Sequence, residues 1–232
     1  MFLSRRTMQK EYFDSERPES EVREFFQCLN RLNKLFVFAE PFQRLLPEML
    51  SAGNCTSLSI LDLGAGDGSL GTALKTWATR REWQWQITNL DTNLAALSLN
   101  SEAINIAASA AALPFRECSF DLVVASQMIH HLSNSTTKQL LREAWRVTRH
   151  GIFLCDLHRN AVLYSMLWLL FCFRRFPESF RGDALLSVKR SWRVTELKTL
   201  ALESGLEQAK VRLYFGTRVV LQAWKAAESP IS

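Results

Sequence analysis

The segment that most constrains the fold runs from Ser59 to Gly71, where a short apolar strand leads into a glycine-rich turn. It reads Ser-Ile-Leu-Asp-Leu-Gly-Ala-Gly-Asp-Gly-Ser-Leu-Gly, and a helical stretch follows over Ser69–Arg80. Glycines allow the backbone to turn tightly and allow a ligand to lie against the main chain. Three alternating glycines with two carboxylates therefore predict a ligand-binding loop between a strand and a helix.

Short apolar strands and helical stretches alternate on both sides of this loop, which is typical of a parallel sheet with crossover helices. Near the C-terminus, a helix over 193–203 is followed by two strands joined tightly around Gly216, which predicts an antiparallel hairpin. The strands are expected at Ser59–Leu63, 83–87, Ile104–Ala108, Phe120–Ala125, Ile152–Cys155, Ala209–Phe215 and Arg218–Trp224, and the further helices at Leu94–Glu102 and Thr136–Val147.

The segment before the first strand is organised differently. Residues 1–20 are polar and predict a loose arm, whereas apolar residues at three-and-four spacing predict a helix from Glu21. A second short helix is expected at Pro41–Leu50. We therefore expect an arm and helices over 1–57 and a main domain over 58–232, with a helical cap inserted at about 159–192.

The composition is that of an ordinary globular protein, with 232 residues, 47% of them hydrophobic and 22% charged. Five scattered cysteines without a C-x-x-C pair argue against a disulfide scaffold or zinc site and favour a reducing, cytoplasmic compartment. The charged N-terminus lacks the apolar core of a signal peptide. The net charge of +5 comes from scattered basic residues, so we read it as a solvated surface and expect no nucleic-acid partner.

The charges of the glycine loop decide between two ligands. Gly66, Gly68 and Gly71 satisfy the dinucleotide pattern G-x-G-x-x-G, which would indicate an NAD(P)-dependent oxidoreductase. A pyrophosphate needs free N–H donors without a nearby anion, and Asp62 and Asp67 would repel it. They favour a cationic ligand without phosphate, and S-adenosylmethionine, which carries a sulfonium and an ammonium group, fits.

At this loop the chain resembles the class I S-adenosylmethionine-dependent methyltransferases. Asp62–Gly68 matches the first motif of that family, and Asp91, at the end of the next strand, matches the acid that binds the ribose hydroxyls. Ala112–Phe115 and Ser119–Val124 match its third and fourth strand regions. The resemblance implies an α/β fold with a Rossmann-like, doubly wound, seven-stranded sheet.

The same resemblance implies S-adenosylmethionine as cofactor and assigns its contacts. Asp62 and the glycines would hold the methionine end, and Asp91 the ribose. Relatives often carry an acid where this chain has Ser109, so a weaker or backbone-assisted contact to adenine is implied. The cofactor-binding residues are expected to be Asp62, Gly64, Ala65, Gly66, Asp67, Gly68, Asp91, Thr92, Ser109, Ala110, Ser126 and Gln127.

The candidate catalytic residues follow two of the strands. His130 and His131 come after the fourth strand, and Asp156 and His158 after the fifth, so we expect all four near one cleft at the strand ends. Histidine suits proton removal from a hydroxyl, with His131 as the preferred base and His130 second. Alternatively, one histidine packs behind the cofactor and the other caps the next helix. No short ligand spacing predicts a metal site.

The apolar run Ala161–Phe173 is shorter than the about 20 residues that span a membrane. We expect ordinary core, a lid over a lipophilic acceptor, or an interfacial anchor with basic ends that gives peripheral membrane contact. The chain is also similar to small methyltransferases encoded beside type III polyketide synthases and to quinone-biosynthesis methyltransferases, notably in Leu29–Asn33 and Leu186–Arg190. This likeness implies O-methylation of a polyketide-, pyrone- or quinone-like acceptor. The expected substrate residues are Asp156, His158 and Trp168.

Two other functions stay open beside the oxidoreductase. One is a methyltransferase acting on RNA or protein, drawn to its substrate by the basic surface. Against amino-group methylation of nucleobases, Ser126–Ile129 follows the fourth strand where such enzymes carry a proline-rich turn. The other is a non-catalytic cofactor-binding protein.

Overall fold

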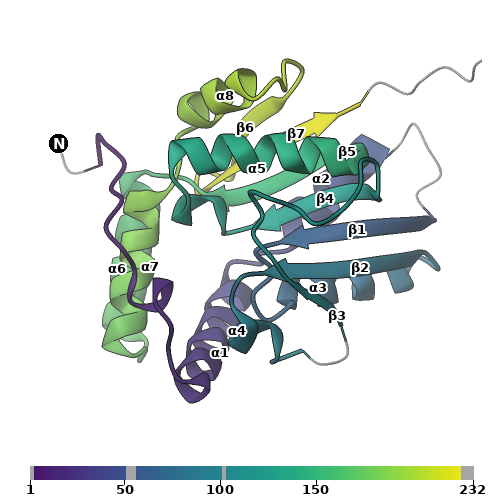
Figure 1. Ribbon diagram of the computed structural model, residues 1–232. Helices are drawn as coiled ribbons and strands as arrows, with labels where there is room; N and C mark the ends of the chain where they lie inside the picture. Colours follow the sequence, from purple (N-terminus) through teal and green to yellow (C-terminus); the bar gives the residue numbers. More distant parts are fainter. Residues whose placement is uncertain (1–2, 51–55, 101–102, 226–232) are drawn as a thin grey trace, which may run out of the picture.

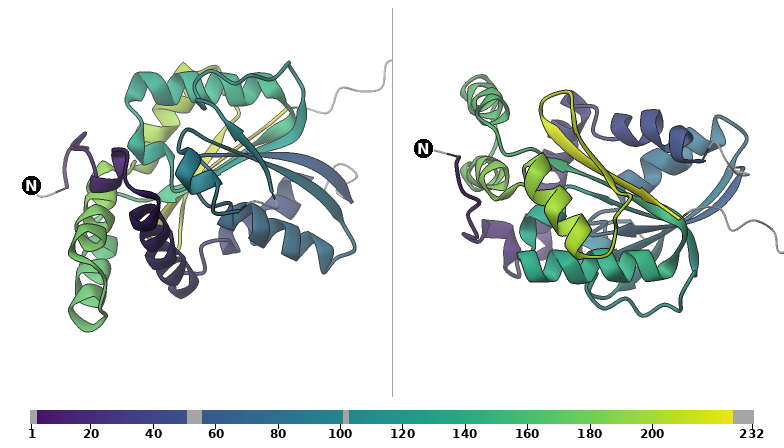
Figure 2. Two further views of the ribbon diagram at one scale, coloured as in Figure 1. Left: turned by 60° about the horizontal axis from the view of Figure 1, so that its bottom comes forward. Right: turned by 90° about the horizontal axis from the view of Figure 1, so that it is seen from above.

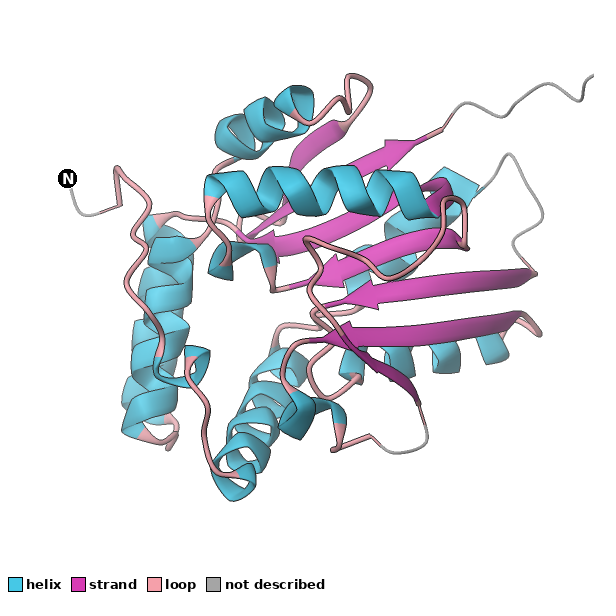
Figure 3. Cartoon of the chain, viewed as in Figure 1, coloured by secondary structure: helices cyan, strands magenta, loops and turns pink. Residues whose placement is uncertain are grey.

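The computed structural model describes residues 3–50, 56–100 and 103–225, which form a seven-stranded sheet flanked by helices (Figures 1 and 3). The strand order is β3-β2-β1-β4-β5-β7-β6. The first five strands pair in parallel, and β7 pairs antiparallel with both β5 and β6. This arrangement confirms the predicted doubly wound sheet with its antiparallel hairpin. The strands are β1 (Ser57–Leu63), β2 (Gln84–Asp91), β3 (Ile104–Ala107), β4 (Phe120–Ser126), β5 (Thr148–Leu157), β6 (Lys210–Tyr214) and β7 (Arg218–Trp224).

The strand order reverses at β1, which pairs with β2 on one side and β4 on the other. In open α/β sheets such a reversal leaves a crevice outside the carboxyl ends of the strands. The arrowheads of these strands all point to the left in Figure 1, so the loops that follow β1, β2, β4 and β5 gather at one edge. The helices are η1 (Tyr12–Asp14), α1 (Glu19–Leu35), α2 (Glu40–Leu50), α3 (Ser69–Thr79), α4 (Leu94–Leu97), η2 (Ile129–His131), α5 (Asn134–Val147), α6 (Ala161–Phe173), α7 (Glu178–Arg190) and α8 (Val194–Glu203).

Helices cover both faces of the sheet (Figure 2). The alternation of side chains along β1 therefore divides the core into two layers. Leu61 and Leu63 pack towards α5 and α8, whereas Leu58 and Ile60 pack towards α2 and α3. Successive residues of a strand point to opposite faces, so a sheet covered by helices on both sides needs apolar residues at every position. This explains the apolar runs of the central strands, such as Leu122–Ala125 in β4 and Ile152–Cys155 in β5, whereas β2 mixes apolar and polar residues.

A third apolar cluster lies beyond the carboxyl ends of the strands and joins α1, α6 and α7. Leu32 of α1, Leu163 of α6 and Phe180 of α7 are among its buried members. In Figure 1 α6 and α7 stand to the left of the strand arrowheads. Helix α1 reaches the glycine loop, where the side-chain amide of Asn30 donates to Asp67. The sequence pattern did not indicate α7, because its apolar residues are interrupted by Gly182 and Asp183.

The N-terminal arm differs from the loose segment expected from its polarity. Glu11 is only 5% exposed, and the backbone N–H groups of Tyr12 and Phe13 donate to the carboxylate of Asp183, at 2.7 and 3.1 Å. The guanidinium of Arg6 donates to two carbonyls of the turn after β4. Several polar groups of the arm therefore pair with polar groups of the main domain, which holds the arm against it. A second difference concerns α4, which ends at Leu97, whereas the sequence pattern indicated a helix to Glu102. The last two residues of that predicted helix lie outside the described part of the chain.

Candidate functional site

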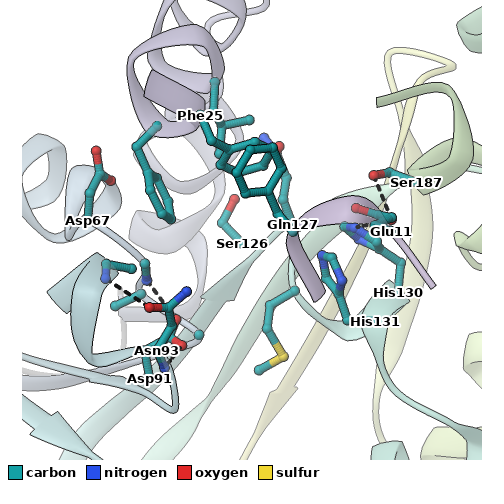
Figure 4. A pocket seen from close by; sticks show the side chains of 18 of the residues that line it. Glu11, Phe25, Asp67, Asp91, Asn93, Ser126, Gln127, His130, His131 and Ser187 are labelled. Carbon is teal, nitrogen blue, oxygen red and sulfur yellow. Dashed lines mark hydrogen bonds and ion pairs between the residues drawn. The ribbon is translucent and has the colours of Figure 1, made fainter. Parts of the chain in front are cut away.

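A cavity of about 820 Å³ lies at the carboxyl ends of the strands, between the glycine loop and the cluster of α1, α6 and α7. Cavities of this size hold drug-sized ligands. Figure 4 shows its two ends: Asp67 and Asp91 lie on one side, and His130, His131 and Glu11 on the other. The cavity can therefore place two ligand groups side by side, each with its own set of polar residues.

The glycine loop after β1 adopts a backbone that only glycine takes without strain. Gly64, Gly66 and Gly68 have φ angles of 64°, 57° and 72°, in the left-handed region. A Cβ atom on Gly64 would stand 2.2 Å from the side chain of Met128, and one on Gly66 would stand 2.6 Å from the ring of Phe26. The loop thus lies directly against its neighbours, and a larger residue would not fit.

Asp62 ends the strand before this loop and is buried at 1% exposure. Its Oδ2 atom lines the cavity region without a hydrogen-bond partner among the described residues. Burial, followed by the neighbouring charge of Asp91, raises the pKa of Asp62 well above its ordinary value of 3.8. The backbone N–H of Gly71 donates to this carboxyl group, but its second oxygen has no partner and would be satisfied by a cationic ligand. The site therefore fits the ammonium group of S-adenosylmethionine and not a pyrophosphate.

Asp91 ends β2 and faces the same cavity (Figure 4). Its carboxylate accepts hydrogen bonds from the backbone N–H groups of Gly66, at 2.8 Å, and Asn93, at 2.9 Å. The acid is thereby fixed against the glycine loop, with lone pairs left for further donors. Asp67 is held separately, by the side-chain amide of Asn30 at 2.7 Å and by Ser69.

The rest of the predicted cofactor residues also border the cavity, with one exception. Ser109 uses its hydroxyl oxygen to accept from the N–H of Ala111, at 3.2 Å, and Gln127 donates to Asn33 of α1, at 3.0 Å. Gly68 lies outside the lining and serves as the N-terminal residue of α3. The predicted residues that line the cavity are Asp62, Gly64, Ala65, Gly66, Asp67, Asp91, Thr92, Ser109, Ala110, Ser126, Gln127, His130 and His131.

His130 and Asp156 form a buried pair at the other end of the cavity. The imidazole Nδ1 of His130 lies 2.7 Å from Asp156 Oδ1, and the backbone N–H of His130 donates to Oδ2 at 3.0 Å. Although burial works against the ionised form, the charge and hydrogen bonds of His130 hold the pKa of Asp156 below 3.8. An ionised carboxylate at Nδ1 fixes the orientation of the ring and leaves Nε2 free to accept a proton.

The N-terminal arm adds a carboxyl group that the sequence did not single out. Glu11 Oε1 lies 4.0 Å from His130 Nε2, and the hydroxyl of Ser187 donates to it at 2.9 Å. Burial raises the pKa of Glu11 to about 7, against the opposing charges of His131 and Arg190. Glu11 and Ser187 are 176 positions apart, so no local spacing could have indicated this contact.

His131, the preferred base of the sequence analysis, has a different partner. Its Nδ1 lies 2.7 Å from Asp14 Oδ1, and its side chain is 35% exposed. Although burial opposes it, hydrogen bonds from His131 and Arg190 hold the pKa of Asp14 below 3.8. The two neighbouring histidines therefore differ in their surroundings: His130 is buried with Asp156, and His131 is tied to the arm.

The predicted substrate residues do not line the cavity. Asp156 lies behind His130, and His158 is half-buried with its Nδ1 2.7 Å from the side-chain amide of Asn160. Trp168 is 55% exposed on the outer face of α6, and Leu163 and Leu167 of that helix face the cavity in its place. The apolar run carries no charge that distinguishes its two faces, so the sequence could not show which face is inside.

One group of side chains in the described residues has ligand atoms close enough for a metal ion. Atoms of Glu11, His130 and His131 lie within 4.8 Å of one another. The guanidinium of Arg190, however, stands 3.4 Å from Glu11 and already provides a positive charge there. The arrangement therefore fits a network of acids and bases.

The doubly wound sheet, the glycine loop after β1 and the acid that ends β2 define the class of S-adenosylmethionine-dependent methyltransferase folds. Residues 61–155 match a family model described as a methyltransferase domain. No curated protein matches the chain in sequence.

Solved structures show the same fold at low sequence identity. A SAM-dependent methyltransferase from Aquifex aeolicus has a TM-score of 0.60 at 14% identity, with 90% of this chain and 99% of that chain covered. Human N-acetylserotonin methyltransferase, in complex with SAM, has a TM-score of 0.57 at 15% identity, with 90% and 57% covered. A candidate O-methyltransferase from Nostoc punctiforme has a TM-score of 0.55 at 18% identity, with 81% and 56% covered.

This chain spans little more than half the length of the human and Nostoc proteins. The match to the methyltransferase domain covers the strands and loops that carry Asp62, the glycines and Asp91. Residues 61–155 therefore resemble a methyltransferase domain and the whole sheet shares the fold of SAM-dependent methyltransferases, and neither finding favours an oxidoreductase.

Proposed function

We propose that this protein transfers a methyl group from S-adenosylmethionine to a hydroxyl group of a lipophilic small molecule. The observation that carries the proposal is the buried His130–Asp156 pair, placed across one cavity from the glycine loop and Asp91. A methyl donor at one end and a proton acceptor at the other are what O-methylation needs. The bound cofactor supplies an electrophilic methyl group on a sulfonium with a neutral leaving group.

The role proposed for His130 is that of general base. The carboxylate of Asp156 accepts a hydrogen bond from the Nδ1–H of the ring, so that Nε2 can take the hydroxyl proton of an acceptor. This step forms an imidazolium, and the ionised Asp156 stabilises its charge. His130 therefore takes the place of His131 as the favoured base, because both its ring and its Nδ1 partner Asp156 are buried.

Alignment is the second contribution of the chain. A methyl transfer requires nucleophile, methyl carbon and sulfur in line, and fixed orientation of two reactants can supply about 7–11 kcal/mol. The glycine loop and Asp91 would fix the donor, while the wall opposite would fix the acceptor. The elements that form this wall are the arm, α1, α6 and α7.

The lipophilic character of the acceptor follows from that wall. Val22, Phe25 and Leu29 of α1 face the cavity together with Leu163 and Leu167 of α6. Side chains of this kind gain from burying alkyl or aromatic groups, at roughly 0.8 kcal/mol per methylene. A pyrone-, polyketide- or quinone-like ring with an apolar substituent and an acidic hydroxyl suits such a cavity.

The test is a methyl-transfer assay with labelled S-adenosylmethionine and a panel of phenols, hydroquinones and hydroxypyrones of increasing alkyl length. We expect products that carry the label on oxygen, identified by mass spectrometry. Titrations with S-adenosylhomocysteine and NADP⁺ provide the control, because only the former should bind. A labelled product on nitrogen or on carbon, or binding of NADP⁺ alone, would contradict the proposal.

A further inference from the structure

Helix α6 has two apolar faces with different surroundings. Leu163, Leu167 and Phe171 are buried in the cluster of α1, α6 and α7. The opposite face is exposed to solvent although it is apolar, and Phe173 is 81% exposed. Between Asn160 and Pro177 the chain carries no acidic residue. The exposed positions of α6 are Ala161, Val162, Ser165, Met166, Trp168, Leu169, Cys172 and Phe173.

The exposed apolar surface continues beyond the start of α6. The side-chain amide of Asn160 donates to the carbonyl of Gly216, at 2.7 Å, which ties the start of the helix to the tip of the β6–β7 hairpin. Phe215 at that tip is 73% exposed. Both views in Figure 2 place α6 at the outer edge of the molecule, with the rest of the protein on its other side. Isolated exposed apolar residues are common, but a patch that covers a whole helix face indicates an interaction site.

Cationic side chains flank this surface at both ends. Arg174 and Arg175 follow directly on α6 and are exposed. Arg44 lies 5.9 Å from the ring of Phe215, and Arg31 lies 5.0 Å from the ring of Phe176. A helix with an apolar face, no acids and basic ends has the charge pattern of segments that lie in the headgroup region of a membrane.

We propose that α6 and the tip of the hairpin dock on the surface of a membrane rich in anionic lipids. The exposed face of α6 would lie among the acyl chains near the headgroups, and the arginines would contact lipid phosphates. Helix α6 would lie along the surface, because no helix among the described residues has the length and apolar character needed to cross a bilayer. The docking itself does not depend on the methyl acceptor.

Docking on a membrane would also affect how the acceptor reaches the cavity, and this consequence rests on the proposed function. The same helix that meets the lipid contributes Leu163 and Leu167 to the cavity. A lipophilic acceptor dissolved in the bilayer would then reach the cavity without passing through water. The surface and the cavity can be tested separately, since vesicle binding needs no methyl transfer.

The experiment is sedimentation of the full chain with sucrose-loaded vesicles of phosphatidylcholine, with and without phosphatidylglycerol. We expect binding to the anionic vesicles only. The double change Leu169→Glu and Phe173→Glu should weaken it at least about tenfold, because it puts two charges on the exposed face of α6 that would enter the lipid. The matched control is Leu202→Glu on α8, since Leu202 is 49% exposed and Leu169 is 52% exposed.

A second pair of variants separates the charges from the apolar face. Arg174→Gln with Arg175→Gln should reduce binding to anionic vesicles roughly tenfold or more, whereas Lys75→Gln with Arg80→Gln on α3 should not. Binding of S-adenosylhomocysteine should be unchanged in all variants, which shows that each has folded. Failure of the unchanged protein to bind anionic vesicles, or equal binding by the Leu169/Phe173 variant, would overturn the proposal. So would a dimer in equilibrium sedimentation that the same variant dissociates, because a second copy would then cover the surface.

Discussion

A substitution at Gly66 tests two costs of adding a side chain there: the strain of the left-handed backbone and the contact with Phe26. The change Gly66→Ala adds a single methyl group to a residue with φ of 57°. The left-handed backbone costs an L-residue about 1–2 kcal/mol. The new Cβ would also stand 2.6 Å from the ring of Phe26, and overpacking of that kind costs about 1–3 kcal/mol. We therefore expect a loss of about 2–5 kcal/mol in the free energy of unfolding.

Gly216 provides the matched control. It has φ of 71°, and a Cβ there would meet nothing within 4 Å. Gly216→Ala should therefore cost only the backbone part, about 1–2 kcal/mol. For a protein of this size each further 1 kcal/mol lowers the melting temperature by about 2–4 °C, so thermal unfolding resolves the two variants. In a Phe26→Ala background the extra cost of Gly66→Ala should disappear, because the ring is no longer there.

Cofactor binding gives the second readout of the same variants. Titration calorimetry with S-adenosylhomocysteine should show at least about tenfold weaker binding for Gly66→Ala, since a side chain displaces the ligand from the backbone. Gly216→Ala should bind as the unchanged protein does. If the two variants lose the same stability and bind equally well, the glycine loop is only a turn and the reasoning is refuted.

Four further changes test other parts of the site. Asp91→Ala should weaken S-adenosylhomocysteine binding about 100-fold or more, because two charge-assisted hydrogen bonds to ribose are worth ~1.5–3 kcal/mol each; unchanged calorimetric affinity would exclude the assignment. Asp156→Asn should lower kcat about 10²–10⁴-fold with cofactor affinity intact, and a normal kcat would remove His130 as the base. Burial raises the pKa of Glu11 from 4.5 to about 7, so its contribution to stability is present below pH 4.5 and lost as the pH rises to about 7. The melting temperature of the Glu11→Gln variant should not show this loss between pH 4.5 and about 7. If the melting temperatures of the variant and the unchanged protein have the same pH dependence, the expectation is contradicted. Leu167→Phe should weaken the binding of long-chain acceptors by ~0.8 kcal/mol for each methylene that the larger ring excludes, and so raise their KM. A KM that does not change with chain length would show that α6 does not limit the acceptor.

The sequence predicted the sheet and the cofactor end of the cavity because their signals are local. Asp62, the three glycines and the strand that holds them lie within one short segment, and the backbone of glycine explains the pattern. The apolar strands were equally clear, because a sheet covered on both faces needs apolar residues throughout. Element boundaries shifted by a few residues, as in β5, which starts at Thr148.

The acceptor end was less predictable because its contacts join distant segments. In the sequence, Glu11 is an ordinary polar residue of the arm. Only the structure shows that it lies beside Ser187 and His130. The sequence analysis preferred His131 to His130, and only the partner of each ring separates the two histidines. The orientation of α6 was also not encoded in its pattern, because Trp168 and Leu167 are both apolar while only Leu167 is buried.

The two ends of the cavity also differ in how far apart in the sequence their contacting residues lie. The glycine loop and Asp91 come from neighbouring β-α units, whereas the arm closes on Ser187 and Arg190 across a separation of 176 residues. Contacts between distant segments form only after the cost of closing a long loop has been met. The half of the cavity beside the glycine loop can therefore assemble from local contacts, and the half beside His130 is completed only when the whole chain has come together.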